Sequence, residues 1–283
     1  MVLVSVIMIT YCHDRYILDA IEGVMNQQCD FDIELIVAND CSPDNTDLIV
    51  TNFLSQHSNP SWIKYTKHDE NIGMQRNFIW ASKQCKGKYI AMCEGDDYWT
   101  DPLKLQKQVD FLNSNSDYVI CFHRVNVLKP NGKVVSDFIT RLPDNYHLRD
   151  VFLINGNYMH TPSVMYRNFL VEFPKIFEFA PEGDFLLYVL LTKFGKIGYI
   201  KDVMAIYRYN VGVISRSKDK YFNNILIVNM ISLRMVDDDS DLKLLIQRNL
   251  DFALYQYTNL PISILIKNIV NIPNRLLKKY LFK

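Results

Sequence analysis

The stretch Ala91-Met92-Cys93-Glu94-Gly95-Asp96-Asp97-Tyr98-Trp99 decides the fold. Its first residues continue an apolar run from Tyr89 that is typical of a buried strand, and this run leads directly into three carboxylates spaced by one glycine. Such carboxylates repel one another unless a positive charge lies between them, and a divalent cation that bridges a diphosphate is the natural candidate. Gly95 lets the backbone approach a ligand closely. A solvated acidic turn is the alternative, but strand, carboxylates and aromatic residues together favour a binding site.

The residues before this stretch alternate between strand and helix patterns. Apolar, β-branched runs predict strands at residues 2–9, 33–38, 62–66 and 89–93, and apolar residues at helical spacing predict helices between them, including 74–84. This alternation predicts an α/β fold with a doubly wound, mostly parallel, Rossmann-like sheet. Ligands of such sheets bind at the carboxyl ends of the strands.

The residues after Trp99 continue with mixed signals and end in helices. We expect a helix from Pro102 to about Asn113 and another over residues 221–236. The remaining predicted elements are strands at 118–128, 133–139, 160–167, 196–201 and 203–209, and helices at 148–154, about 183–194 and 242–257. We therefore predict one α/β domain at 1–218, with halves at about 1–100 and 101–218, and a helical extension at 219–283.

Composition narrows the classes of function. The 283 residues have a formal net charge of zero, which argues against a nucleic-acid partner held by electrostatics. The six cysteines are scattered without a C-x-x-C pair and are interpreted as reduced thiols of a cytoplasmic protein. The amino terminus lacks the pattern of a secretion signal, and no apolar run is long enough to cross a bilayer.

The strand ends suggest how a nucleotide is held. Tyr11, Asp40 and the Glu94/Asp96/Asp97 cluster all follow strands, so we expect them to converge on one crevice. The chain lacks G-x-G-x-x-G after its first strand and lacks the P-loop motif, which disfavours dehydrogenases and P-loop enzymes. A nucleotide held by an aromatic face, a carboxylate on its base and a metal on its phosphates fits better.

Five motifs in register resemble the family 2 glycosyltransferases of GT-A fold, from residue 4 to about 215. They are Ser5-Val6-Ile7-Met8-Ile9-Thr10-Tyr11, Glu34-Leu35-Ile36-Val37-Ala38-Asn39-Asp40-Cys41-Ser42, Asn71-Ile72-Gly73, Arg76-Asn77 and Glu94-Gly95-Asp96-Asp97. The resemblance implies a GT-A type sheet, a nucleotide-sugar donor, most often UDP-linked, a divalent metal (Mn²⁺ or Mg²⁺) and inversion at the anomeric carbon.

The resemblance also implies roles for single residues. Tyr11, following Thr10 at the first strand end, would stack on the base, and Asp40 would accept a hydrogen bond from it. Arg76 would approach the phosphates or the base. Glu94 would lie against the ribose, Asp96 would ligate the metal, and Asp97 would line the sugar pocket with Gly95 beside it.

The base of the reaction is expected at a second acidic cluster, Glu182-Gly183-Asp184. Inverting transfer needs a group that accepts the proton of the attacking hydroxyl, and the dipole of a helix start keeps a carboxylate ionised. We select Asp184, with Glu182 as the rival. The chain departs from the family pattern at Asn39, Glu94, Gly183 and Asn210, where acids or histidine are common.

The sequence therefore predicts an inverting, metal-dependent glycosyltransferase that acts on a hydroxyl of a glycan or lipid-linked glycan, in bacterial surface polysaccharide synthesis. The apolar, basic segment 261–283 is compatible with peripheral contact at the inner face of the cell membrane, or with packing on the domain or on a second subunit. A nucleotidyltransferase and a non-catalytic sugar-nucleotide-binding module are the alternatives.

Overall fold

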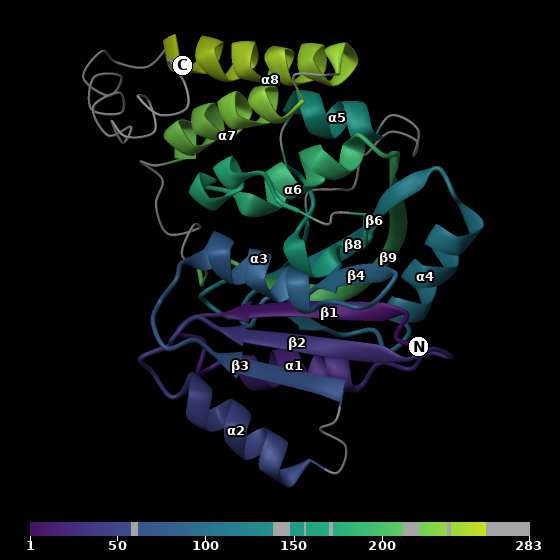
Figure 1. Ribbon diagram of the computed structural model, residues 1–283, viewed down its shortest axis with the longest axis vertical. Helices are drawn as coiled ribbons and strands as arrows, with labels where there is room; N and C mark the ends of the chain where they lie inside the picture. The colour runs from purple at the N-terminus through teal and green to yellow at the C-terminus, as the bar shows by residue number, and fades with distance from the viewer. Residues whose placement is uncertain are drawn as a thin grey trace.

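The computed structural model describes residues 1–57, 62–137, 148–155, 157–169, 172–211, 221–236 and 239–258. Its amino-terminal half alternates strands and helices as predicted (Figure 1). The elements are β1 (Val4–Thr10), α1 (Ile17–Met25), β2 (Ile33–Asn39), α2 (Thr46–Gln56), β3 (Ile63–Lys67), α3 (Met74–Gln84) and β4 (Tyr89–Met92).

Strand β1 lies inside a parallel unit with the order β3-β2-β1-β4. The register pairs Thr10 with Asn39 and Ile7 with Met92, so the loops after β1, β2 and β4 leave the same edge. Backbone bonds tie these loops together, because Asp40 N–H donates to the Thr10 carbonyl (3.0 Å) and Gly95 N–H donates to the Ile9 carbonyl (3.1 Å). The predicted convergence of the three strand ends is confirmed.

The second half of the sheet contains both parallel and antiparallel strands. The elements of this part of the chain are β5 (Tyr98–Trp99), α4 (Lys104–Ser114), β6 (Tyr118–Leu128), β7 (Val134–Ser136), α5 (Leu148–Asn155), the 3₁₀ turns η3 (Thr161–Ser163) and η4 (Lys175–Phe179), β8 (Met165–Arg167), α6 (Gly183–Thr192) and β9 (Lys196–Arg208). The order continues β4-β8-β6-β9-β5, with β7 on β6. Strand β8 is antiparallel to both neighbours, whereas β6 and β9 are parallel.

Two predicted strand boundaries were wrong. The strand expected at 160–167 begins only at Met165, because Pro162 has no N–H to give to a ladder and the preceding residues turn as η3. The strands expected at 196–201 and 203–209 are one strand, β9. Lys201 and Asp202 fall between its partnered residues, and this irregularity bends a continuous strand instead of ending it.

The sheet carries a separate apolar core on each face, as the period of two along a strand requires. In β1, Ile7 and Ile9 face one core, whereas Val6 and Met8 face the other. The first core is completed by apolar residues of α3, α5 and α6, including Phe78, Phe152 and Leu187. The second is completed by α1 and α4, including Ile21, Leu105 and Val109. This packing on both faces fixes the shared loop edge.

The two carboxyl-terminal helices extend the first core. Helices α7 (Tyr221–Met235) and α8 (Ser240–Thr258) lie over α5 and α6 at the top of Figure 1. Val228, Ile231 and Ile246 join the same apolar cluster. None of the helices in the described ranges is long and apolar enough to span a membrane. The segment 261–283 lies outside the described residues, and the domain boundary at 218/219 stays a prediction.

Candidate active site

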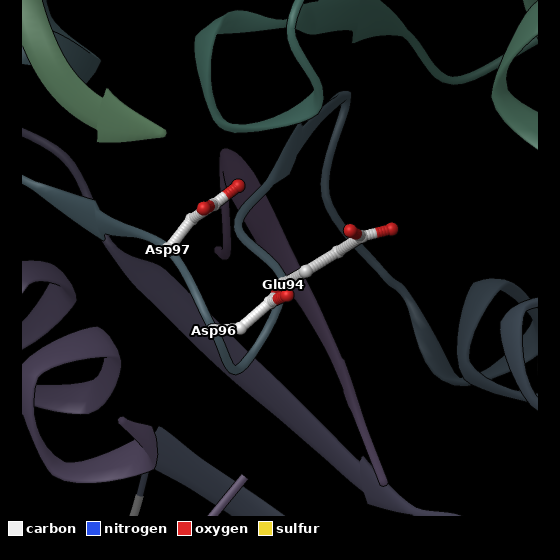
Figure 2. Close-up of side chains that lie close together, drawn as sticks. All are labelled: Glu94, Asp96 and Asp97. Atoms are coloured by element: carbon white, nitrogen blue, oxygen red, sulfur yellow. The ribbon is translucent and has the colours of Figure 1, made fainter. Parts of the chain in front are cut away.

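The acidic loop after β4 brings three carboxylates together at the shared strand edge. Glu94, Asp96 and Asp97 each offer an oxygen within 4.8 Å of the others, and Figure 2 shows all three leaving one short loop. Asp96 and Asp97 are buried, and Glu94 is half-buried. Oxygen ligands in such a group match the preference of Mg²⁺ and Mn²⁺.

Gly95 is required by how closely this loop approaches β1. A Cβ on Gly95 would lie 2.7 Å from Thr10 Oγ1 and 2.9 Å from Thr10 Cβ. Thr10 is buried, and its hydroxyl lies 3.2 Å from His13 Nδ1. His13 Nε2 in turn lies 3.8 Å from Asp96 Oδ2. Thr10 and Gly95, both predicted site residues, therefore pack the acidic loop against the end of β1.

The electrostatics of the cluster favour a bound cation. Burial, together with the neighbouring charges of Asp96 and Asp184, raises the pKa of Glu94 to about 8. Burial and the charge of Asp96 raise the pKa of Asp97 well above its usual range. Asp97 Oδ2 is buried and has no hydrogen-bond partner among the described residues. An orphaned carboxylate oxygen beside two further acids fits a metal ligand, since a divalent cation would stabilise the ionised forms.

Arg208, at the end of β9, holds this loop in place, and sequence reasoning gave it no role. Its backbone N–H donates to Asp97 Oδ1 (2.8 Å), and its Nη1 donates to the Asp96 carbonyl (2.8 Å). Nη2 pairs with Asp19, and the guanidinium carbon lies 4.9 Å from the ring centre of Tyr16 and 4.5 Å from that of Tyr98. The signal available in the sequence was the segment Tyr207-Arg208-Tyr209-Asn210, which resembles the Y-R-x-H segment of the family, but the partners of Arg208 are distant in sequence.

Asp40 has a stronger local role than the sequence suggested. Its side chain is buried, and its two carboxylate oxygens accept the backbone N–H groups of Ile72 (2.7 Å) and Gly73 (3.0 Å). Gly73 has a φ of +89°, so this turn before α3 needs a glycine. Tyr11 follows β1 and is 36% exposed. The charge of Asp40 is among the causes, after Cys12 and burial, that raise the pKa of the Tyr11 hydroxyl.

Two further residues that the sequence singled out, Arg76 and Asn39, bind other residues of the chain. Arg76 pairs through Nε with Glu178 Oε2 at 2.9 Å, and its side chain is largely exposed. Asn39, a departure from the family pattern, donates to Tyr65 OH (2.9 Å) and accepts from the Ser42 N–H (2.9 Å). Because an amide both donates and accepts, Asn39 is explained by local structure.

The second acidic cluster lies at the start of α6, near enough to the first for the charge of Asp184 to act on Glu94. The charge of Asp184 contributes to the raised pKa of Glu94. Burial and the charge of Asp184 also raise the pKa of Glu182, the residue before the helix, to about 7. Asp184 accepts hydrogen bonds from Phe185 N–H (2.8 Å) and from Asn157 Nδ2 (2.7 Å). Asn157 was not foreseen from the sequence. Asn210, at the end of β9, is exposed and has a φ of +64°.

Comparison with known proteins shows the family and the relatives that this chain resembles. Residues 5–172 match the family model described as glycosyl transferase family 2. An uncharacterised protein of Mycobacterium tuberculosis is 34% identical over 207 residues, which cover 72% of this chain and 58% of that protein. An uncharacterised glycosyltransferase of Nostoc is 29% identical over 214 residues, 72% of this chain and 64% of that protein. The chain thus spans less than two thirds of the length of these relatives.

Solved structures share the fold. The structure of Staphylococcus aureus TarS 1–349 in complex with UDP-GlcNAc has a TM-score of 0.61 at 17% identity and covers 98% of this chain and 76% of that one. The mannosyltransferase PcManGT of Pyrobaculum calidifontis, in complex with GDP-Man and Mn²⁺, has a TM-score of 0.58 at 14% identity, with 98% and 81% covered. At these identities the likeness concerns the fold alone.

Proposed function

This chain belongs to glycosyl transferase family 2, and from that premise we propose that it transfers a sugar, with inversion, from a nucleoside-diphosphate sugar to a hydroxyl of a glycan or lipid-linked glycan. One observation carries the proposal. Three carboxylates, one with an orphaned buried oxygen, gather at the carboxyl edge of a parallel sheet, where this fold type holds its ligands.

Asp96 is the proposed metal ligand, and Glu94 and Asp97 complete the acidic environment. A bound Mn²⁺ or Mg²⁺ would neutralise charge on the departing nucleoside diphosphate. The proposal is supported by the orphaned Asp97 oxygen and by the related fold of a mannosyltransferase solved with GDP-Man and Mn²⁺. We propose a UDP-linked donor, in line with the UDP-GlcNAc bound to TarS.

The rim residues are proposed to hold the nucleoside. Tyr11 offers an exposed ring on which a base can stack. The Asp40 carboxylate keeps lone pairs beyond the two that accept Ile72 and Gly73, so it can still accept a base N–H while it shapes the turn. Arg76 reaches the donor only if its pair with Glu178 opens.

Asp184 is the proposed base. As the acceptor hydroxyl oxygen forms its bond to the anomeric carbon, the bond from that carbon to the diphosphate oxygen breaks, and the hydroxyl proton passes to the Asp184 carboxylate. The hydrogen bonds of Asp184 favour it over Glu182, because the Asn157 side chain and the Phe185 N–H orient its two carboxylate oxygens. A preorganised carboxylate needs little rearrangement during transfer.

The proposal also places the enzyme in bacterial surface polysaccharide synthesis, on the cytoplasmic side, with peripheral membrane contact through 261–283. This part rests on the family resemblance and on the basic, apolar composition of that segment. Extraction with the membrane fraction, compared between the full chain and a chain ending at residue 258, tests the contact.

The test of function begins with thermal melts of the protein against nucleotide sugars with and without MnCl₂. The stabilising donor is then assayed for metal-dependent release of nucleoside diphosphate. We expect stabilisation that requires both donor and Mn²⁺, and turnover that is lost in Asp96→Asn and Asp184→Asn. Donor binding without any release in the presence of varied acceptors would favour the non-catalytic binding module, and full turnover in Asp184→Asn would remove the base assignment.

A further inference from the structure

Asn157 lies between α5 and η3 and contacts Asp184 in a fixed orientation. Its Nδ2 donates to Asp184 Oδ2 at 2.7 Å, and its Oδ1 accepts the backbone N–H of Met159 at 3.0 Å. Because the Met159 N–H can only donate, it requires the amide oxygen on its side and directs the NH₂ group toward Asp184. A flipped amide would place donor against donor and acceptor against acceptor.

The second oxygen of Asp184 is held as well. Oδ1 accepts the N–H of Phe185 at 2.8 Å, so both carboxylate oxygens of Asp184 are oriented by hydrogen bonds. Donors to the ionised form lower the pKa of a carboxyl, and the Phe185 N–H, the N–H of Asp184 itself and the Asn157 side chain all act in that direction on Asp184.

The surroundings of Asp184 act in the opposite direction. Burial raises its pKa. Burial and the Asp184 charge raise the pKa values of Glu182, the residue immediately before α6, and of Glu94, in the loop after β4. Burial and the same charge also raise the pKa values of Tyr188, on α6, and Tyr207, on β9, so both hydroxyls stay neutral and add no charge near Asp184. A carboxylate that is buried near two further acids is stabilised in its ionised form by specific hydrogen-bond donors.

We propose that Asn157 is the positioning residue of the base, which keeps the Asp184 carboxylate ionised and oriented to accept the acceptor proton. The inference rests on the proposed function, in which Asp184 is that base. Asn157 does not touch the reacting atoms in this account and acts only through Asp184.

The variant Asn157→Asp tests this inference because it changes one group and keeps the shape. Its Oδ1 still accepts the Met159 N–H, so the connection keeps its anchor, but a carboxylate oxygen replaces the NH₂ group that faces Asp184. We expect the upper apparent pKa of the resulting acid pair to exceed the wild-type pKa of Asp184 by more than one unit, which is about a tenfold change in the protonation equilibrium. Asn157→Ala, which removes the donor without adding charge, is expected to raise the pKa of Asp184 by a smaller amount.

The readout is the pH titration of the Asp184 carboxyl by ¹³C NMR of the full chain labelled at aspartate, in EDTA, with the signal assigned by its loss in Asp184→Asn. Asn131→Asp is the matched control, since Asn131 also accepts a backbone N–H through Oδ1, that of Lys133, but on an exposed turn. It adds the same charge and should leave the Asp184 pKa unchanged.

The outcomes separate this inference from the proposed function. If both Asn157 variants leave the Asp184 pKa within about 0.3 units of wild type, a tolerance worth less than 0.5 kcal/mol, the inference is overturned. If Asn157→Asp does not fold, Asn157→Ala decides alone by the same titration. Loss of nucleoside diphosphate release in Asp184→Asn supports the base assignment independently. Full release in that variant would overturn the proposed base while the titration still reports on Asn157.

Discussion

Replacing Asp97 with asparagine should stabilise the metal-free protein and destroy its response to metal. Asp97 is fully buried, and its Oδ1 accepts the Arg208 N–H at 2.8 Å. Its Oδ2 has no partner in the described part of the chain, and its pKa is raised by burial and by Asp96. Asparagine keeps the bond to Arg208 and replaces the orphaned oxygen with a donor beside two acids.

The magnitude follows from the orphaned oxygen. A buried polar atom without a partner costs about 1–3 kcal/mol, and asparagine relieves this cost. In a domain of this size about 1 kcal/mol shifts the melting temperature by about 2–4 °C, so Asp97→Asn should melt about 2–12 °C higher in EDTA. The stabilisation of wild type by MnCl₂ should be lost in the variant, since one charge of the cluster is gone.

The matched control is Asp40→Asn, the same substitution at an acid whose oxygens are both satisfied. One amide NH₂ group would face the N–H of Ile72 or Gly73, which leaves a buried donor unpaired and costs about 1–3 kcal/mol. This variant should melt lower in EDTA and keep its response to MnCl₂. The reasoning is refuted if Asp97→Asn melts lower than wild type in EDTA, or if it keeps the full Mn²⁺ shift.

Two further predictions concern stability and geometry. Gly95→Ala places a Cβ 2.9 Å from Thr10 Cβ, and no rotamer change can relieve this contact. Urea unfolding should therefore show a free energy of unfolding that is lower by about 1–3 kcal/mol, and Mn²⁺ binding should be weaker. If neither quantity changes, the close approach of Gly95 to Thr10 is contradicted. Glu182 has a pKa of about 7 in the folded protein against about 4.5 unfolded, so the folded state binds more protons between these values and wild-type stability falls as pH rises through this window. Glu182→Gln should therefore gain on the order of 1–3 kcal/mol relative to wild type between pH 5 and pH 8 by urea unfolding, and an equal difference at both pH values would show that Glu182 titrates normally.

The parts of the fold predicted correctly are those that local pattern determines. Buried parallel strands such as β1 and β4 are continuous apolar runs, and polar residues follow each run where the strand ends. The order of the parallel strands then brings Thr10, Asp40 and Gly95 to one edge. Strand β9 was divided in prediction because Lys201 and Asp202 resemble a turn, and only pairing with β6 shows that they bulge within one strand.

The site residues that the sequence missed depend on contacts between distant segments. Arg208 reaches the acidic loop across 111 positions, and Asn157 reaches Asp184 across 27. Arg208 belongs to the segment Tyr207-Arg208-Tyr209-Asn210, which resembles a family motif, but the sequence does not identify the partner of Arg208 or of Asn157. Asp40 was assigned to the base of the nucleotide, but its bonds to the turn at 72–73 become visible only with the register of β2 and the start of α3 known.

The central claim is that the acidic loop after β4 binds a divalent cation together with a diphosphate. Its most direct test is a titration of Mn²⁺ into the full chain, measured by electron paramagnetic resonance with and without UDP. We expect one Mn²⁺ site whose affinity rises with UDP, as linkage between cation and diphosphate requires, and falls about tenfold or more in Asp96→Asn. Mn²⁺ binding that is equal in wild type and Asp96→Asn, or that UDP leaves unchanged, would contradict it.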